Sequence, residues 1–197
     1  MAMFPIIESD IENYLNENLM DIIKKIESVY EVDNSLYESI KILPCMNKDI
    51  QKTDSDGYPS FNLIALGRYI SMDEPIKINL EKLRKKISDL EKIVKRPHVY
   101  LLCDLVLIHE FMHAYQDIIE KKVMPRDIPK DMPKDKLREY KRILDEDANA
   151  KTLKVFCEAY TEPVEIRKQV FNFFLQDSDC KLPDGQNFML AFDMSTR

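Results

Sequence analysis

The sequence predicts an α+β fold that is mainly helical, with a small mixed sheet packed on one buried helix. Composition supports the helical part, because the chain has only three glycines, no tryptophan and long runs of Leu, Ile, Lys and Glu. Several segments carry apolar residues at helical spacing, whereas short runs rich in Ile, Leu, Phe and Tyr between residues 37 and 80 favour strands. A chain of 197 residues can bury a continuous core, so a single domain spanning residues 1–197 is expected.

The N-terminal segment predicts an amphipathic helix that packs over the core. Its apolar side chains recur at helical spacing, and Ser9 or Asp10 stands near its start, where a capping residue is expected. The apolar set is Ile7, Ile11, Tyr14, Leu15, Leu19, Ile22, Ile23 and Ile26.

Three strands are expected in the next part of the chain. Residues 37–43 and 60–69 are rich in strand-forming side chains and are separated by a turn signal at residues 54–59. Residues 75–80 alternate apolar with polar side chains and begin with Pro75, a combination that suits an edge strand.

The most apolar stretch of the chain, Leu101 to Ile119, predicts a buried helix and contains His109, Glu110 and His113 in the pattern HExxH. Side chains four residues apart share one face of a helix, so both imidazoles can reach one zinc ion while Glu110 points at a metal-bound water. Two imidazoles and a carboxylate need a partner in such apolar surroundings. A pair of core histidines satisfied by neighbouring carboxylates is the alternative explanation.

An open zinc site with two histidines needs one more protein ligand. The metzincin pattern HExxHxxGxxH is excluded, because Gln116 and Ile119 stand where its glycine and third histidine would be. Asp117 lies one turn beyond His113, too far along the helix axis to close the tetrahedron, so we expect it in a supporting or surface role. The third ligand should therefore come from another helix.

An acidic cluster at residues 144–150 is the strongest source of that ligand, and it opens onto another predicted helix. The small and apolar positions of this helix define one face, which reaches Asp145 when it is extended backwards. Asp145 is therefore the predicted ligand, with Asn149 on the same face one turn later. The positions that define the face are Ala148, Thr152, Phe156 and Ala159.

Two alternatives to Asp145 stay open at this point. Glu146 has the longer side chain and lies only about 100° away around the helix, so it is the rival ligand. Asp147 is rotated by about 200° and should meet water. An acidic first turn that complements the helix dipole would also explain part of the cluster without any metal.

The HExxH pentapeptide and the element formed by Asp145, Ala148 and Asn149 together resemble gluzincin-type zinc metallopeptidases, nearest in pattern to the ImmA/IrrE-like intracellular peptidases. In that group an ExxA(N/D) element places a carboxylate on the metal and an Asn or Asp behind it. This chain has aspartate where the family usually has glutamate, and Lys151-Thr152 replaces the usual Phe-Ala pair. The resemblance implies a zincin-like core in which an edge strand before the HExxH helix pairs with an extended substrate. Residues 76–80 are the matching strand, although an ordinary solvated edge is an equal alternative.

The function that the sequence favours is zinc-dependent hydrolysis of peptide bonds. The metal ligands for Zn²⁺ are expected to be His109, His113 and Asp145. Glu110 would act as general base on the metal-activated water, and the metal would polarise the carbonyl under attack. Asn149 would orient a histidine or the ligand carboxylate without binding the metal itself.

Other roles stay possible on the sequence alone. Tyr140 or Tyr160 could donate a hydrogen bond to the oxyanion, but spacing does not choose between them. The alternative functions are a metal-binding pseudo-peptidase that acts as a sensor or protein-interaction module, and a helical interaction protein that binds no metal.

A formal net charge of −6 argues against general nucleic-acid binding. One helical segment is nevertheless crowded with basic side chains, for which a solvated face is the favoured explanation. These side chains are Lys82, Arg84, Lys85, Lys86, Lys92, Lys95 and Arg96. The expected partner is a protein or peptide substrate, and a regulatory protein is one candidate for it.

Cysteine usage and the N-terminal residues predict a cytoplasmic protein. Cys45, Cys103, Cys157 and Cys180 show neither CxxC spacing nor a disulfide-framework pattern, so reduced thiols are expected. The N-terminus lacks a basic region followed by an apolar core, and the HExxH motif interrupts the longest apolar run before it reaches membrane-spanning length. We therefore expect neither secretion nor membrane insertion.

A proline repeat separates the two predicted metal-binding helices. Residues 124–127, 128–131 and 132–135 are three copies of an apolar-Pro-basic-Asp unit, and proline at every fourth residue excludes a regular helix. A turn-rich segment is expected, either as a rim or lid beside the cleft or as a plain connector, which is favoured. Beyond it, Pro163 suits the first turn of a last helix at residues 164–175, whose aromatic stripe predicts core packing.

Overall fold

The computed structural model describes residues 5–32, 40–45, 66–129 and 131–176. Within these ranges the chain is mainly helical and contains a three-stranded mixed sheet, so the predicted α+β, mainly helical class is confirmed. The predicted turn at residues 54–59, and residues 60–65 of the second predicted strand, lie outside the described residues. No helix in the described part of the chain is long and apolar enough to cross a membrane.

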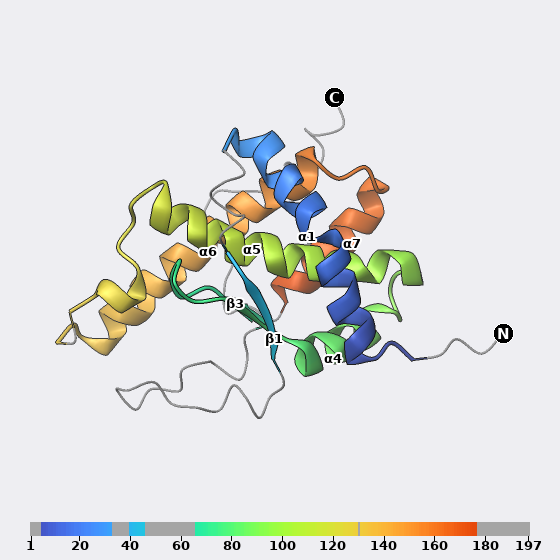
Figure 1. Ribbon diagram of the computed structural model, residues 1–197, viewed down its shortest axis with the longest axis horizontal. Helices are drawn as coiled ribbons and strands as arrows, with labels where there is room; N and C mark the ends of the chain where they lie inside the picture. The colour runs from blue at the N-terminus through green and yellow to red at the C-terminus, as the bar shows by residue number, and fades with distance from the viewer. Residues whose placement is uncertain (1–4, 33–39, 46–65, 130, 177–197) are drawn as a thin grey trace.

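Helix α5 (Leu101–Ile118) runs through the middle of the molecule, with the other helices packed around it (Figure 1). Almost every face of its N-terminal two thirds is buried, as the apolar sequence predicted. Burial of one Leu or Ile side chain contributes about 1.5–3 kcal/mol, so this helix is a main source of the stability of the core. Its buried polar residues are the exceptions that require partners, and they are Asp104, Glu110 and Gln116.

Helix α1 (Glu8–Tyr30) covers the core with the predicted apolar face, burying Ile11, Leu15, Ile22, Ile23 and Ile26. Its first turn is closed by Asp10, whose carboxylate accepts a hydrogen bond from the backbone N–H of Ile7 at 3.0 Å. Tyr14 crosses to the central helix, where its hydroxyl donates to Asp104 at 2.9 Å.

The sheet has the strand order β1-β3-β2, formed by β1 (Ile42–Cys45), β2 (Gly67–Arg68) and β3 (Ile76–Asn79). β1 runs parallel to β3, and β2 runs antiparallel to it. The first strand is therefore shifted towards the C-terminus relative to the predicted residues 37–43, of which 37–39 lie outside the described part.

The prediction that residues 75–80 form an edge strand is wrong, because β3 is the central strand. Pro75 precedes the strand, so its missing N–H costs the ladder nothing, and the N–H of Ile76 already donates to the carbonyl of Lys41 at 2.7 Å. Ile76 and Ile78 are fully buried between the neighbouring elements. The strand that lies at the sheet edge beside α5 is β2.

Helix α4 (Leu80–Leu90) follows β3 directly, and the side chain of Asn79 caps it by accepting from the N–H of Lys82. The basic segment is not one helix, because α4 ends at Leu90 and the chain turns before the 3₁₀ helix η1 (Arg96–Tyr100). Part of the basic face is paired within the fold, since Arg84 binds Glu8 of α1 at 2.6 Å.

The proline repeat is turn-rich as predicted: its first copy forms the short 3₁₀ helix η2 (Pro125–Asp127), and Pro133 stands immediately before helix α6 (Lys134–Glu158). The acidic cluster at residues 144–150 therefore lies in the middle of α6, so the alternative of an acidic first turn is wrong. The predicted inward face of this helix is confirmed by the burial of its residues Ala148, Thr152 and Phe156. Helix α7 (Val164–Leu175) adds Val170, Phe171 and Phe174 to the core.

Candidate metal centre

The two histidines of the HExxH motif lie side by side on α5. Because they are one turn apart, the Nε2 atoms of His109 and His113 are 3.1 Å from each other. Their rings are nearly perpendicular, at 86°, with centroids 4.7 Å apart. Two ring nitrogens with converging lone pairs are the start of a metal site.

Asp145 of α6 completes a group of three potential ligands. Its Oδ1 lies 3.2 Å from Nε2 of His113, and the three ligand atoms lie within 4.8 Å of one another. Zinc bonds of about 2.0–2.2 Å place the corners of a tetrahedron about 3.3–3.6 Å apart, so both short separations are near the edges that a zinc ion requires. The three donor atoms could therefore hold a metal ion, and the two short separations are compatible with the predicted zinc.

Glu146, the rival ligand, points elsewhere. Its carboxylate binds Arg142 one turn earlier on α6, and among the described residues the group that could hold a metal contains Asp145 and not Glu146. Helical geometry explains the difference, because only Asp145 shares the inward face with Asn149.

The expectation that Asp147 meets water holds in part, because its side chain is 32% exposed but is also paired within the fold. Its Oδ2 accepts hydrogen bonds from Gln116, Lys122 and Lys151. Although burial raises the pKa of the Asp147 carboxyl, these donors outweigh burial and lower the pKa to about 2, so the group is ionised.

Asn149 lies fully buried behind His109. It is close enough to raise the pKa of that imidazole, but neither Nδ1 of His109 nor the polar side-chain atoms of Asn149 make a well-formed hydrogen bond in the described part of the chain. Unsatisfied buried polar atoms cost free energy, and they recur where a fold is arranged for a ligand. The predicted supporting position of Asn149 is therefore beside His109.

The two histidines have different protonation behaviour. Burial and the neighbouring His113 lower the pKa of His109 to about 3, so the His109 ring is neutral. Burial also lowers the pKa of His113, but the hydrogen bond to Asp145 and the charge of Glu110 outweigh it and raise that pKa to about 9. A metal ion at this site would therefore displace a proton from His113.

Glu110 is buried next to the ligand group. Desolvation raises the pKa of its carboxyl to about 7, against the opposing effects of His113 and of a hydrogen bond from backbone. That bond comes from the N–H of Tyr69, which donates to Oε2 of Glu110. A carboxyl with a pKa near neutrality can accept or release a proton under ordinary conditions.

Edge strand β2 approaches Glu110 closely because residue 67 is glycine. A Cβ at Gly67 would lie 2.9 Å from Cγ and Oε1 of Glu110, closer than side-chain atoms are found. Neither Gly67 nor Tyr69 is marked by the sequence motifs, although Gly67 is one of only three glycines in the chain.

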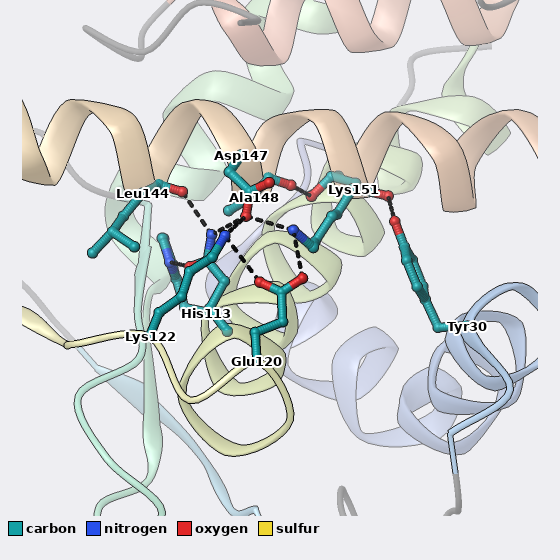
Figure 2. A network of polar contacts seen from close by, with 10 residues as sticks. Tyr30, His113, Glu120, Lys122, Leu144, Asp147, Ala148 and Lys151 are labelled. Atoms are coloured by element: carbon teal, nitrogen blue, oxygen red, sulfur yellow. Dashed lines mark hydrogen bonds and ion pairs between the residues drawn. The ribbon is translucent and has the colours of Figure 1, made fainter.

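A network of polar contacts reaches His113 at its Nδ1 atom (Figure 2). Nδ1 of His113 lies 2.8 Å from Oε1 of Gln116, and the amide nitrogen of Gln116 donates to the carbonyl of Leu144 and to Asp147 on α6. Lys122 and Lys151 each contact both Asp147 and Glu120, so two cations alternate with two carboxylates. The motifs mark Gln116 only as a departure from the metzincin glycine, although a polar residue three positions after a predicted ligand on an apolar helix was a usable signal.

Asp117 also has a supporting role, at the end of α5. It accepts from the hydroxyl of Tyr69 at 2.7 Å and from Arg126 of the proline repeat at 2.8 Å through both carboxylate oxygens. Arg126 also donates to the carbonyl of Ile70. These contacts tie the proline repeat to the segment that carries the Tyr69 N–H.

Neither tyrosine considered as an oxyanion donor has a hydroxyl directed at the ligand group. Tyr160 donates to Asp104 at 3.0 Å inside the core, and Tyr140 donates to the carbonyl of Val123 at 2.7 Å.

Comparison with known proteins found no match to the chain among family models, curated proteins or solved structures. What this centre can do must therefore be inferred from its own donor atoms. Two imidazoles, one carboxylate and an adjacent buried carboxyl are suited to holding a divalent metal and moving a proton beside it.

Proposed function

We propose that this protein is a zinc-dependent peptidase of the gluzincin kind, with His109, His113 and Asp145 as the metal ligands. The observation that carries the proposal is the ligand group itself, in which Nε2–Nε2 and Nε2–Oδ1 separations of 3.1 and 3.2 Å lie near the edges of a zinc tetrahedron. The resemblance to ImmA/IrrE-like peptidases supports the same proposal. The proposal includes a zincin-like core, which is supported by the packing of α5 beside an edge strand and against the helix that carries the third ligand.

Three protein ligands would leave one tetrahedral position of a zinc ion open for a water molecule, which is typical of catalytic rather than structural zinc. Asp145 is 35% exposed, so solvent reaches the group from the α6 side. A zinc ion held there would supply Lewis acidity, lowering the pKa of a water molecule and polarising a carbonyl oxygen.

Glu110 would act as the general base. Its pKa of about 7 suits a group that takes a proton and later returns it to the leaving amine. The Tyr69 N–H and the close approach of Gly67 would hold the carboxylate in place between proton transfers.

Protein or peptide chains are the proposed substrates, with a regulatory protein as one candidate. An extended substrate that adds a strand would approach from β2, because β3 is already paired on both sides. This replaces residues 76–80 as the proposed substrate-pairing strand.

Two measurements test this function together. Elemental analysis after mild dialysis is expected to find about one zinc per chain. The Glu110→Gln variant should keep that zinc but lose cleavage of a peptide library monitored by mass spectrometry, because the amide preserves size and removes the base. Glu146→Ala is the matched control, since Glu146 is an acid of α6 that faces Arg142.

Each failure has a distinct meaning. A protein that neither retains nor takes up zinc contradicts the metal centre. Zinc without any peptide cleavage by the parent protein instead supports the metal-binding sensor or protein-interaction module. Unchanged cleavage by Glu110→Gln contradicts the role assigned to Glu110.

A further inference from the structure

Gln116 joins a proposed metal ligand on α5 to the backbone of α6, the helix that carries Asp145, through hydrogen bonds. It is fully buried on α5, three residues after His113. Its amide spans from the imidazole of His113 to the carbonyl of Leu144 and the carboxylate of Asp147.

The orientation of the Gln116 amide follows from its two partners on α6. A backbone carbonyl and an ionised carboxylate only accept hydrogen bonds, so the NH₂ group must face Leu144 and Asp147, at 2.9 and 2.7 Å. A flipped amide would place oxygen against two oxygens and leave a buried NH₂ beside His113. The amide oxygen therefore faces His113.

The protonation of the His113 ring follows in turn. An amide oxygen has no proton to give, so a hydrogen bond over the 2.8 Å to Nδ1 requires the proton to be on Nδ1 of His113. When the neutral ring has its proton on Nδ1, the lone pair is on Nε2, the atom that lies 3.1 Å from His109 and 3.2 Å from Asp145.

The polar network around Asp147 fixes Gln116 from behind. Lys122 donates to Oδ2 of Asp147 at 2.6 Å and to Glu120 at 2.9 Å, and Lys151 contacts the same two carboxylates. Lys122 reaches this position because the chain reverses after α5 at Lys121, which has a φ of 53°, and the N–H of Lys122 returns to the carbonyl of Gln116. The acceptors of the Gln116 amide are thereby held in place from two elements.

We propose that Gln116 is a positioning residue of the metal centre, which keeps a proton of His113 on Nδ1 and leaves Nε2, the atom nearest His109 and Asp145, as the one that would bind the metal. The inference rests on the metal-binding part of the proposed function. Because Gln116 is bonded to α6 as well, it also sets the spacing between the helix that carries both histidines and the helix that carries Asp145. Gln116 contributes no metal bond of its own.

The first test uses ¹⁵N NMR of the labelled parent protein, with and without added Zn²⁺, to locate the protons of the His113 ring. Nδ1 of His113 should carry a slowly exchanging proton in both states, whether the metal-free ring is neutral or charged. Zinc should bind through Nε2 and change mainly the ¹⁵N chemical shift of that atom. An unprotonated Nδ1, or zinc bound through Nδ1, would overturn the proposal. A charged ring has a proton on Nδ1 in any case, so the slow exchange of that proton is the result that matters in the metal-free protein. Fast exchange there would overturn the proposal even if the parent protein binds no zinc, in which case the proposed function fails separately.

The second test measures zinc affinity by competition with a chelating dye. Gln116→Met keeps the length of the side chain but removes the acceptor and both donors, and should weaken binding by about 10- to 100-fold. Thr152→Val is the matched control, because it removes a buried hydrogen bond of α6 to Ala148 that does not touch His113. Equal zinc affinity in these two variants would show that Gln116 only joins the helices. If Gln116→Met does not fold, the spectrum of the parent protein decides alone.

Discussion

Gly67 of β2 and Glu110 of α5 lie in direct contact, with no room for any side chain between them. A Cβ at residue 67 would lie 2.9 Å from Cγ and Oε1 of Glu110 and 3.0 Å from Cγ1 of Val106. The glycine is required here by space, and the backbone that follows it supplies the Tyr69 N–H to the same carboxylate. The position of the proposed general base thus depends on a residue 43 positions earlier in the chain.

Gly67→Ala is expected to displace the Glu110 carboxylate while leaving the three metal ligands in place. Zinc content should stay near that of the parent protein, peptide cleavage should fall by about tenfold or more, and overpacking should cost about 1–3 kcal/mol of unfolding free energy. Cleavage assays, elemental analysis and urea unfolding measure these effects. Lys77→Ala on β3 is the control, and full cleavage by Gly67→Ala would show that Glu110 does not depend on this contact.

Asp145→Ala should weaken zinc binding far more than Glu146→Ala does. Removal of a ligand is expected to cost more than about 100-fold in affinity, the upper end for supporting residues, whereas Glu146→Ala removes only a contact with Arg142. Dye competition on the two variants measures the difference. The assignment is contradicted if the Glu146 variant alone loses its metal.

Asp104 should make stability depend on pH between about 4 and 6. Burial raises the pKa of this carboxyl from 3.8 to about 6, although Tyr14 and Tyr160 donate to it and oppose the shift. The folded state then holds the proton more tightly than the unfolded state, so its stabilising effect is present below pH 4 and is lost as the pH rises to about 6, with a magnitude on the order of 2 kcal/mol. This sign is the reverse of that for a salt-bridged aspartate.

Urea unfolding of the parent protein and of Asp104→Asn at pH 4 and pH 7 tests the effect. Asparagine carries no charge at either pH, so the variant should gain stability relative to the parent between the two values. A stability difference that is the same at both pH values would mean that Asp104 does not change its charge in this range.

Arg126 and Asp117 should be energetically coupled. Nη2 of Arg126 donates to both carboxylate oxygens of Asp117 and so joins the proline repeat to α5, but both side chains are partly exposed, and a coupling of about 0.5–1 kcal/mol is expected. A double-mutant cycle with Arg126→Met and Asp117→Asn measures it by urea unfolding. Zero coupling would support the interpretation of the proline repeat as a plain connector.

Local periodicity in the sequence was sufficient to predict most residues of the candidate metal centre. The apolar run around HExxH predicted a buried helix, and the spacing of Ala148, Thr152 and Phe156 selected Asp145 and Asn149 for its inward face. These predictions depended on helical geometry over a few turns, which neighbouring residues determine among themselves. The helical class of the fold was predictable for the same reason.

Only the tertiary structure decided the surroundings of those residues. The Tyr69 N–H meets Glu110 across 41 positions, and Gln116 meets Leu144 and Asp147 across 28 and 31, separations over which residue patterns contain no register information. Residues 75–80 were predicted to form an edge strand because alternation and Pro75 describe one strand alone, whereas the two neighbours of a strand depend on how distant segments pair. Asp147 is partly exposed, as its helical angle predicted, but its pairing with Lys122 could not be predicted from the helix alone, because the turn at Lys121 brings that cation to the same face.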